Sequence, residues 1–199
     1  MSKCWTIAVL VGSLFLSACV SIKVPMEVVP DNRRVTQPER GKALVYFVRT
    51  TTYNKDVPAD LYDGDHYIGT IVYGQHIAYS VKPGSHLFMV TNKLIESVEF
   101  MEARLKSGKV YYAAVAPHVA WEGGAFGKMV ARLHFNPQNN NLSQKDIDQA
   151  IHKSRQVKIG EKARRHAAKQ AKRVRKKKAK FLPRWEKSAE HKKRILRAY

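Results

Sequence analysis

The sequence predicts a mainly β fold: a small antiparallel β-sandwich followed by a basic, α-helical C-terminal extension. Short apolar segments separated by turn residues fill the middle of the chain, which is typical of sandwiches and barrels. The composition then changes, because residues 143–199 carry 21 of the 36 Lys and Arg residues but only 5 of the 16 Asp and Glu residues. A polar run over residues 136–141 marks the boundary between the β domain, residues 42–136, and the extension.

The first 18 residues have the features of an export signal. Lys3 supplies a positive start, and residues 5–16 are mainly apolar. This stretch is shorter than the ~20 apolar residues that a permanent membrane helix needs. Small residues follow at Ser17 and Ala18. We therefore expect residues 1–18 to be a signal peptide.

The four residues Leu16, Ser17, Ala18 and Cys19 resemble the lipobox of bacterial lipoproteins. The resemblance implies that diacylglycerol is attached to the sulfur of Cys19, that the chain is cut before this residue, and that its new N-terminus receives a further acyl chain such as palmitate. It also implies the outer membrane, because the residue after Cys19 is not the Asp that retains such proteins in the inner membrane. The alternatives are an ordinary cleaved signal and a buried helix with an incidental Cys.

The mature chain is expected to lack disulfides and free thiols. The second cysteine, Cys4, lies in the segment that would be removed, and Cys19 would carry lipid. A zinc or redox site built on thiols is therefore excluded. Residues 19–41 contain three prolines among polar residues and are expected to form an extended tether.

Eight strands are predicted in the β domain, with turns at Asp63-Gly64, Pro83-Gly84 and Ser107-Gly108. In the sixth strand the apolar residues change face after Phe100, so we expect a β-bulge there. The predicted strands cover residues 43–48, 59–62, 67–73, 76–81, 87–91, 98–105, 110–116 and 128–135.

The β domain also resembles a domain-of-unknown-function family of bacterial envelope lipoproteins. The matching pieces, in order, are Val45-Tyr46-Phe47-Val48-Arg49, Tyr62-Asp63-Gly64, Ile68-Gly69, Pro83-Gly84-Ser85-His86 and Gly108-Lys109-Val110-Tyr111-Tyr112. The resemblance covers about half of the chain and implies a small antiparallel β-sandwich near the cell surface. It implies no catalytic residues, and it does not include the basic extension.

The extension is predicted to contain helices. Ser143 is a suitable N-cap for a first helix, whose residues 147, 150, 151 and 154 share one face. Gly160 would end that helix, and a second would run from Glu161 to Lys180 with a stripe of Ala163, Ala167, Ala171 and Val174. Pro183 is expected to end this second helix.

The other faces of the second helix carry ten cations, which we predict to bind a polyanion because their mutual repulsion is relieved by negative charge. Trp185 and Tyr199, which follow among further cations, are candidates for a membrane interface. The alternative is a solvated, partly disordered tail without a single partner. The ten cations are Arg164, Arg165, Lys169, Lys172, Arg173, Arg175, Lys176, Lys177, Lys178 and Lys180.

The sequence contains no phosphate-binding loop, dinucleotide fingerprint, nucleophile elbow or zinc-protease motif. We therefore expect neither an enzyme nor a cofactor. Asp60, Asp63 and Asp65 surround Gly64 and are expected to be turn residues rather than calcium ligands or catalytic acids. Three regularly spaced histidines are expected at strand edges rather than in a metal site, and Trp121, in a predicted loop, could contact a ligand. These histidines are His66, His76 and His86.

These features predict a non-enzymatic outer-membrane lipoprotein. Its β domain would be an interaction module, and its basic helices would bind an envelope polyanion (lipopolysaccharide, peptidoglycan or anionic lipid) or an envelope protein. The chain's formal charge of +20 favours such acidic partners. The alternative is a sequence-nonspecific nucleic-acid-binding surface protein, because a run such as Lys172–Lys180 does not distinguish between types of phosphate. A hydrolase with a site near Trp121 is a third possibility, supported only by the Asp cluster.

Overall fold

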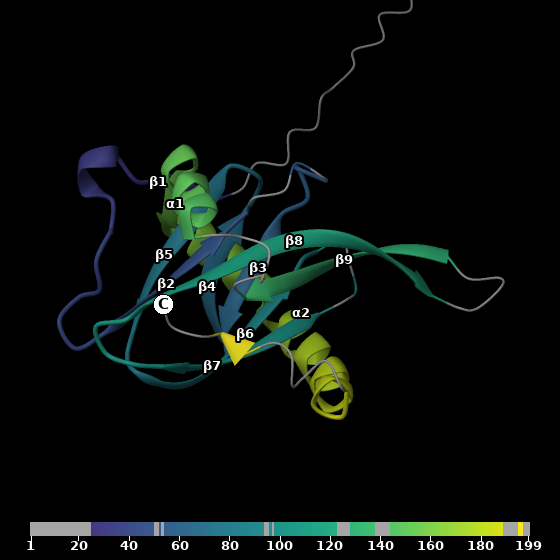
Figure 1. Cartoon of the computed structure of the whole chain (residues 1–199). Coiled ribbons are helices and arrows are strands. Elements are labelled where there is room, and N and C mark those ends of the chain that lie inside the picture. Colours follow the sequence, from purple (N-terminus) through teal and green to yellow (C-terminus); the bar gives the residue numbers. More distant parts are fainter. Residues whose placement is uncertain are drawn as a thin grey trace, which may run out of the picture.

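The computed structural model describes residues 25–49, 52, 54–93, 96, 98–122, 128–137, 144–188 and 195–196. The chain is mainly β, with two sheets and a long helix near its C-terminus (Figure 1). This confirms the predicted β-sandwich with a helical extension. The signal peptide, the lipobox, Ser143 and Tyr199 lie outside the described residues. Within the described residues, no helix is both long and apolar enough to cross a membrane.

The first sheet has six strands in the order β1-β10-β5-β2-β8-β9. Pairs β2–β8 and β10–β5 are parallel, so the expected antiparallel arrangement is incomplete. The strands are β1 (Met26–Val28), β2 (Ala43–Val48), β5 (Gln75–Val81), β8 (Val110–Glu122), β9 (Lys128–Pro137) and β10 (Arg155–Ile159).

The second sheet has five strands in the order β11-β7-β6-β3-β4, of which only β11 and β7 are parallel neighbours. Gly64 has a φ of 58° in the β3–β4 turn, as the predicted Asp63-Gly64 hairpin requires. The strands are β3 (Ala59–Asp63), β4 (His66–Ile71), β6 (Gly84–Thr91), β7 (Glu99–Leu105) and β11 (Ile195–Leu196). The helices are α1 (Gln144–Lys153), α2 (Glu161–Glu186) and a short 3-10 turn, Asp31–Arg33.

The core lies between the two sheets, where alternate residues of each strand meet. All six residues of β2 are buried. Phe47 of β2 meets Phe88 of β6 edge to face, with ring centroids 5.1 Å apart. The apolar sequence of β2 is explained by cover on both faces, because its residues 44, 46 and 48 point away from the core and are also buried.

The predicted bulge at Phe100 is wrong. Strands β6 and β7 pair without interruption from Gly84–Leu105 to Val90–Glu99. Met101 faces the core between the sheets, whereas Phe100 points outward and is buried under α2. The change of apolar face therefore reflects cover on both sides of β7, and the register shift lies instead between Leu61 and Tyr62 of β3.

The expected tether and extension both contribute strands to the sheets. Residues 155–159 were expected in a helix, but they form β10, which places Val157 in the core and pairs with β1 from the expected tether. Near the C-terminus, Pro183 does not end α2, which continues to Glu186, and β11 then pairs with β7. Strands β10 and β11 of the expected extension are thus part of the sandwich rather than an appendage to it. Trp121, expected in a loop, lies in β8.

Candidate functional site

Helix α2 covers the outer face of the five-stranded sheet with an apolar stripe. Its buried residues Ala163, Val174 and Trp185 are spaced so that they lie on one side of the helix. They pack on Tyr62, Tyr67, Met89 and Phe100, which point outward from four neighbouring strands. The Trp185 and Phe100 ring centroids are 5.5 Å apart. This apolar contact fixes which side of the cationic helix faces solvent.

Four of the ten predicted cations face the sandwich instead of a free partner. The Lys177 ammonium donates to the Asn92 carbonyl at 2.9 Å and to Thr91 Oγ1 at 3.3 Å. Arg173 donates to the Lys93 carbonyl at 3.4 Å. Two ion pairs complete the set: Lys178–Asp65 and Lys180–Glu96, each at 2.8 Å. These four cations contribute to docking of the helix.

A buried carboxylate, Asp60, lies beneath the same helix. It accepts a hydrogen bond from Thr70 Oγ1 at 2.6 Å, and Thr70 in turn is hydrogen-bonded to the Tyr67 hydroxyl. Burial raises the pKa of Asp60, while the positive charges of His166, Arg173 and Lys177 on α2 act in the opposite direction. Burial also lowers the pKa of Lys177. Asp60 and its hydrogen-bonded partners therefore lie under the side of α2 that faces the sandwich and not on its exposed side.

The outer side of α2 carries cations that remain exposed. Arg165 is exposed but paired with Glu161 at 2.5 Å. Five others join no ion pair or hydrogen bond between side chains in the described part of the chain. We call them the outward cationic face; they are Arg164, Lys169, Lys172, Arg175 and Lys176.

Two further exposed cations extend this face at its ends. Lys162 precedes the predicted set and Arg184 follows it. Arg184 was missed because the sequence placed the helix end at Pro183, whereas Lys162 lies inside the predicted helix and was left out of the set. The spacing of Trp185 from Val174, three helical turns apart, could have indicated that the helix and its apolar stripe continue to Trp185.

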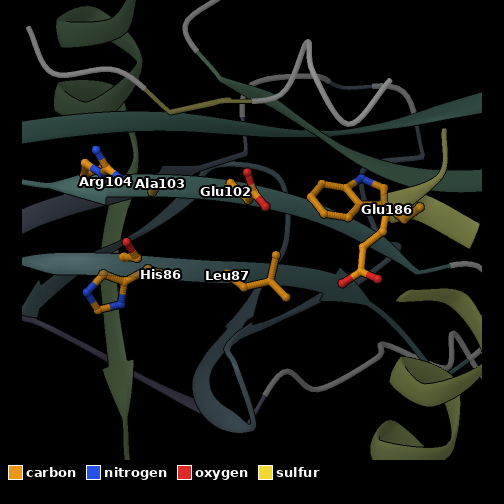
Figure 2. A pocket seen from close by; sticks show the side chains of 8 residues that line it. His86, Leu87, Glu102, Ala103, Arg104 and Glu186 are labelled. Carbon is orange, nitrogen blue, oxygen red and sulfur yellow. The ribbon is translucent and has the colours of Figure 1, made fainter. Parts of the chain in front are cut away.

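Acidic groups lie next to the outward cationic face at the C-terminal end of α2. A cavity of about 610 Å³ lies where α2 stops and the outer face of β6 and β7 is left open. Figure 2 shows the side chains that line it. Leu87 lies on one strand, Glu102 and Arg104 on its neighbour, and Glu186 on the helix. The two carboxylates outnumber Arg104 on this wall, so an anion is less favoured here than along the exposed cations of the helix.

Of the two aromatic candidates for a membrane interface, Trp185 is buried and Tyr199 lies outside the described residues. Trp185 is 8% exposed and packs against Phe100, so its ring is part of the helix–sheet contact. In the part of the chain that the structure describes, the exposed large apolar residues are Val28, Val35 and Tyr73, none of which is on α2. Phe181 and Leu182 of α2 are half-buried against the same contact, so the exposed side of the helix is mainly charged.

One aspartate and one histidine of the sandwich, Asp63 and His86, bond to each other. Asp63 Oδ2 lies 2.7 Å from His86 Nδ1 and accepts from the Tyr79 hydroxyl at 3.2 Å. His86 Nε2 lies 3.0 Å from the Lys82 carbonyl, so both of its ring nitrogens have partners. Among the described residues, no group of three or more His, Cys, Asp or Glu side chains could hold a metal ion.

Comparison with protein-family models finds no match to this chain. No curated protein matches it either. The resemblances to bacterial lipoproteins stay predictions from the quoted residues.

Proposed function

We propose that this chain is a non-enzymatic, lipid-anchored outer-membrane lipoprotein whose helix α2 binds a polyanion of the cell envelope. The lipid on Cys19 would attach the chain to the membrane. The outward cationic face would bind phosphate or carboxylate groups of lipopolysaccharide, peptidoglycan or anionic lipid, or an acidic envelope protein. The observation that carries the proposal is the row of five exposed cations on a helix whose other side is fixed to the sandwich.

A docked helix is well suited to a long anion. The 26 residues of α2 span about 39 Å at 1.5 Å per residue. The five cations occupy successive turns on one side, so they can contact several anionic groups of one polymer together. Each neutralised phosphate releases counterions, which makes such binding favourable at low salt. Because the helix is already ordered, little conformational entropy is lost on binding.

The same geometry argues against insertion of α2 into a bilayer. An interfacial helix buries its apolar side among lipid tails, but that side of α2 is covered by Tyr62, Met89 and Phe100. Two acyl chains would in any case hold the protein stably in its membrane. Binding by charge at the surface of a polymer or headgroup layer is the role that remains for the helix.

The proposal is tested by neutralising the outward cationic face. Removal of residues 143–199 is unsuitable, because it would delete β10 and β11 from the sheets. We instead compare R164Q/K169Q/K172Q/R175Q/K176Q with a control of equal charge change. The control replaces five exposed lysines of the sandwich by Gln: Lys55, Lys82, Lys93, Lys106 and Lys109.

The two variants should differ in affinity for lipopolysaccharide, peptidoglycan fragments and anionic vesicles at matched ionic strength. Each lysine or arginine near an anionic surface contributes about 1 kcal/mol, so we expect the helix variant to bind at least about a hundredfold more weakly. The control variant should bind nearly as the unmodified chain does. Equal losses in both variants would show that only net charge matters and would contradict the proposal.

Nucleic acid is the second candidate partner, because the exposed cations would also bind DNA or RNA phosphates without reading sequence. The same affinity measurements with a DNA duplex of random sequence, at the same salt concentration, distinguish nucleic acid from an envelope polyanion as the partner. Tighter binding to DNA than to every envelope polymer would favour this alternative.

A further inference from the structure

A cavity of about 310 Å³ lies on the other side of the molecule, against the outer face of the six-stranded sheet. Its floor consists of Gln156, His76, Tyr46 and Tyr112. Their chain neighbours Val45, Ile77, Tyr111 and Val157 are in the core, so the four floor residues point outward. The cavity volume is at the lower end of the range for small-molecule sites.

The four floor residues form a continuous row across four neighbouring strands. Gln156 is paired with His76 in the β10–β5 register, and Tyr46 with Tyr112 in the β2–β8 register. The Tyr46 and His76 ring centroids are 5.8 Å apart. Tyr46 and Tyr112 are stacked, with centroids 5.4 Å apart and an interplanar angle of 8°. Rings and planar polar groups therefore follow one another along the floor.

Hydrogen bonds fix the positions of these side chains. The Tyr46 hydroxyl donates to the Val35 carbonyl at 2.9 Å, and the Val35 amide donates to Gln156 Oε1 at 3.0 Å. His76 Nδ1 lies 2.7 Å from Ser154 Oγ, whose own proton goes to the Ile151 carbonyl at 3.1 Å. Nδ1 therefore donates to Ser154. A site held in this way needs little reorganisation to bind a ligand.

His76 is a hydrogen-bond acceptor rather than a cation. Burial lowers its pKa to about 4, and the charge of Arg34 acts in the same direction. The imidazole is therefore neutral at pH 7. With the proton on Nδ1, Nε2 carries a lone pair that can accept from a hydroxyl group.

The walls of the cavity combine opposite charges instead of concentrating one sign. Arg34 lines one wall and is paired with Asp31 at 2.8 Å. Asp148 of α1 lines another wall. Neither a strong anion nor a strong cation is favoured by this arrangement. The carboxamide of Gln156, the imidazole of His76 and the carboxylate of Asp148 provide both donors and acceptors.

We propose that this cavity binds one uncharged saccharide ring. Sugar hydroxyls donate and accept hydrogen bonds, which matches the mixed polar groups of the floor and walls. The apolar CH face of a pyranose packs on aromatic rings such as the half-buried Tyr112. The site is independent of the polyanion proposal, because α2 covers the outer face of the opposite sheet.

The proposal is tested by titrating the full chain in detergent with glucose, N-acetylglucosamine, glucuronate and inorganic phosphate, followed by NMR of the backbone amides. We expect saturable binding of at least one uncharged sugar, with the shifts centred on His76, Tyr112 and Gln156. Tyr112→Ala should weaken this binding by about tenfold, whereas Tyr73→Ala, at an exposed tyrosine outside the cavity, should not.

A second pair of variants keeps the test decisive if Tyr112→Ala does not fold. Asp148 is exposed, so Asp148→Asn should fold and weaken sugar binding by about tenfold, unlike Asp56→Asn. The five-residue α2 variant should retain sugar affinity, which separates this proposal from the polyanion proposal. Absence of saturable sugar binding, tighter binding of phosphate or glucuronate, or sugar binding unchanged in both cavity variants would overturn it.

Discussion

The outer faces of the two sheets are closed in different ways. On the five-stranded sheet, α2 lays an apolar stripe that includes Val174 and Trp185 over outward-pointing aromatic residues. On the six-stranded sheet, the segment around Val35 is joined by hydrogen bonds to Tyr46 and Gln156, and a cavity of about 310 Å³ remains. The apolar contact covers the outer face of the five-stranded sheet and leaves the opposite side of α2 exposed, where it can bind by charge. A hydrogen-bonded contact leaves space for a ligand on the other face.

The largest expected effect is on the closed face. Val174→Asp places a charge in the apolar contact between α2 and the sheet, so we expect the free energy of unfolding to fall by about 4 kcal/mol. Ala179→Asp, on the exposed side of the same helix, should cost less than about 1 kcal/mol. Urea denaturation measures both values. Similar losses in the two variants would mean that α2 is not docked on this side.

The second prediction concerns the hydrogen-bonded face and depends on pH. Because the folded-state pKa of His76 is about 4 against an ordinary 6.5, the unfolded chain takes up a proton first as the pH falls. The contribution of neutral His76 to the free energy of unfolding is therefore full above about pH 6.5 and falls by about 3 kcal/mol as the pH is lowered to 4.

His76→Gln should remove this decline, whereas His66→Gln, at an exposed strand start, should keep it. The comparison of the two variants is needed because burial raises the pKa of Asp60, which changes stability in the opposite direction at acidic pH. Unfolding free energies between pH 4 and pH 7 provide the measurement. Parallel curves for the two variants would show that His76 titrates normally.

The smallest predicted effect compares two neighbouring lysines of α2. Lys177 is half-buried and donates to Asn92 and Thr91, so Lys177→Gln should lower the free energy of unfolding by about 1–2 kcal/mol. Lys176 is exposed on the outward cationic face, and Lys176→Gln should change it by less than about 0.5 kcal/mol. Thermal unfolding of both variants is sufficient. An equal or larger effect at Lys176 would contradict the assigned sides of the helix.

Much of the sandwich was predictable because its signals are local. The strand at residues 43–48 was predicted with the bounds that the structure shows, and the turn at Gly64 follows from its dipeptide. Strand β10 was missed because it is only five residues long and follows helix α1 directly, so its alternating polar and apolar residues were included in the predicted helix. Their β conformation depends on pairing with Gln75 and His76, about 80 residues earlier in the chain, and local pattern does not reveal such pairing.

The candidate site was predictable in composition but not in orientation. The sequence identified ten cations on one helix, yet it could not show which of them dock, because the predicted stripe is mostly Ala and indicates only a weak apolar side. Phe100 is the missing half of that contact. The change of apolar face after Phe100, which led to the prediction of a bulge, was the sequence signal that both faces of β7 are covered.

The central claim is that the outward cationic face of α2 binds an envelope polyanion. It is tested most directly by the salt dependence of binding to lipopolysaccharide micelles, measured for the full chain and for R164Q/K169Q/K172Q/R175Q/K176Q. Each contacted phosphate contributes about 0.9 to the slope of log K against log salt concentration on B-DNA, so the account predicts that the slope becomes shallower in the variant, by up to about 4.5 for five lost contacts. Identical slopes for the two proteins would contradict the claim.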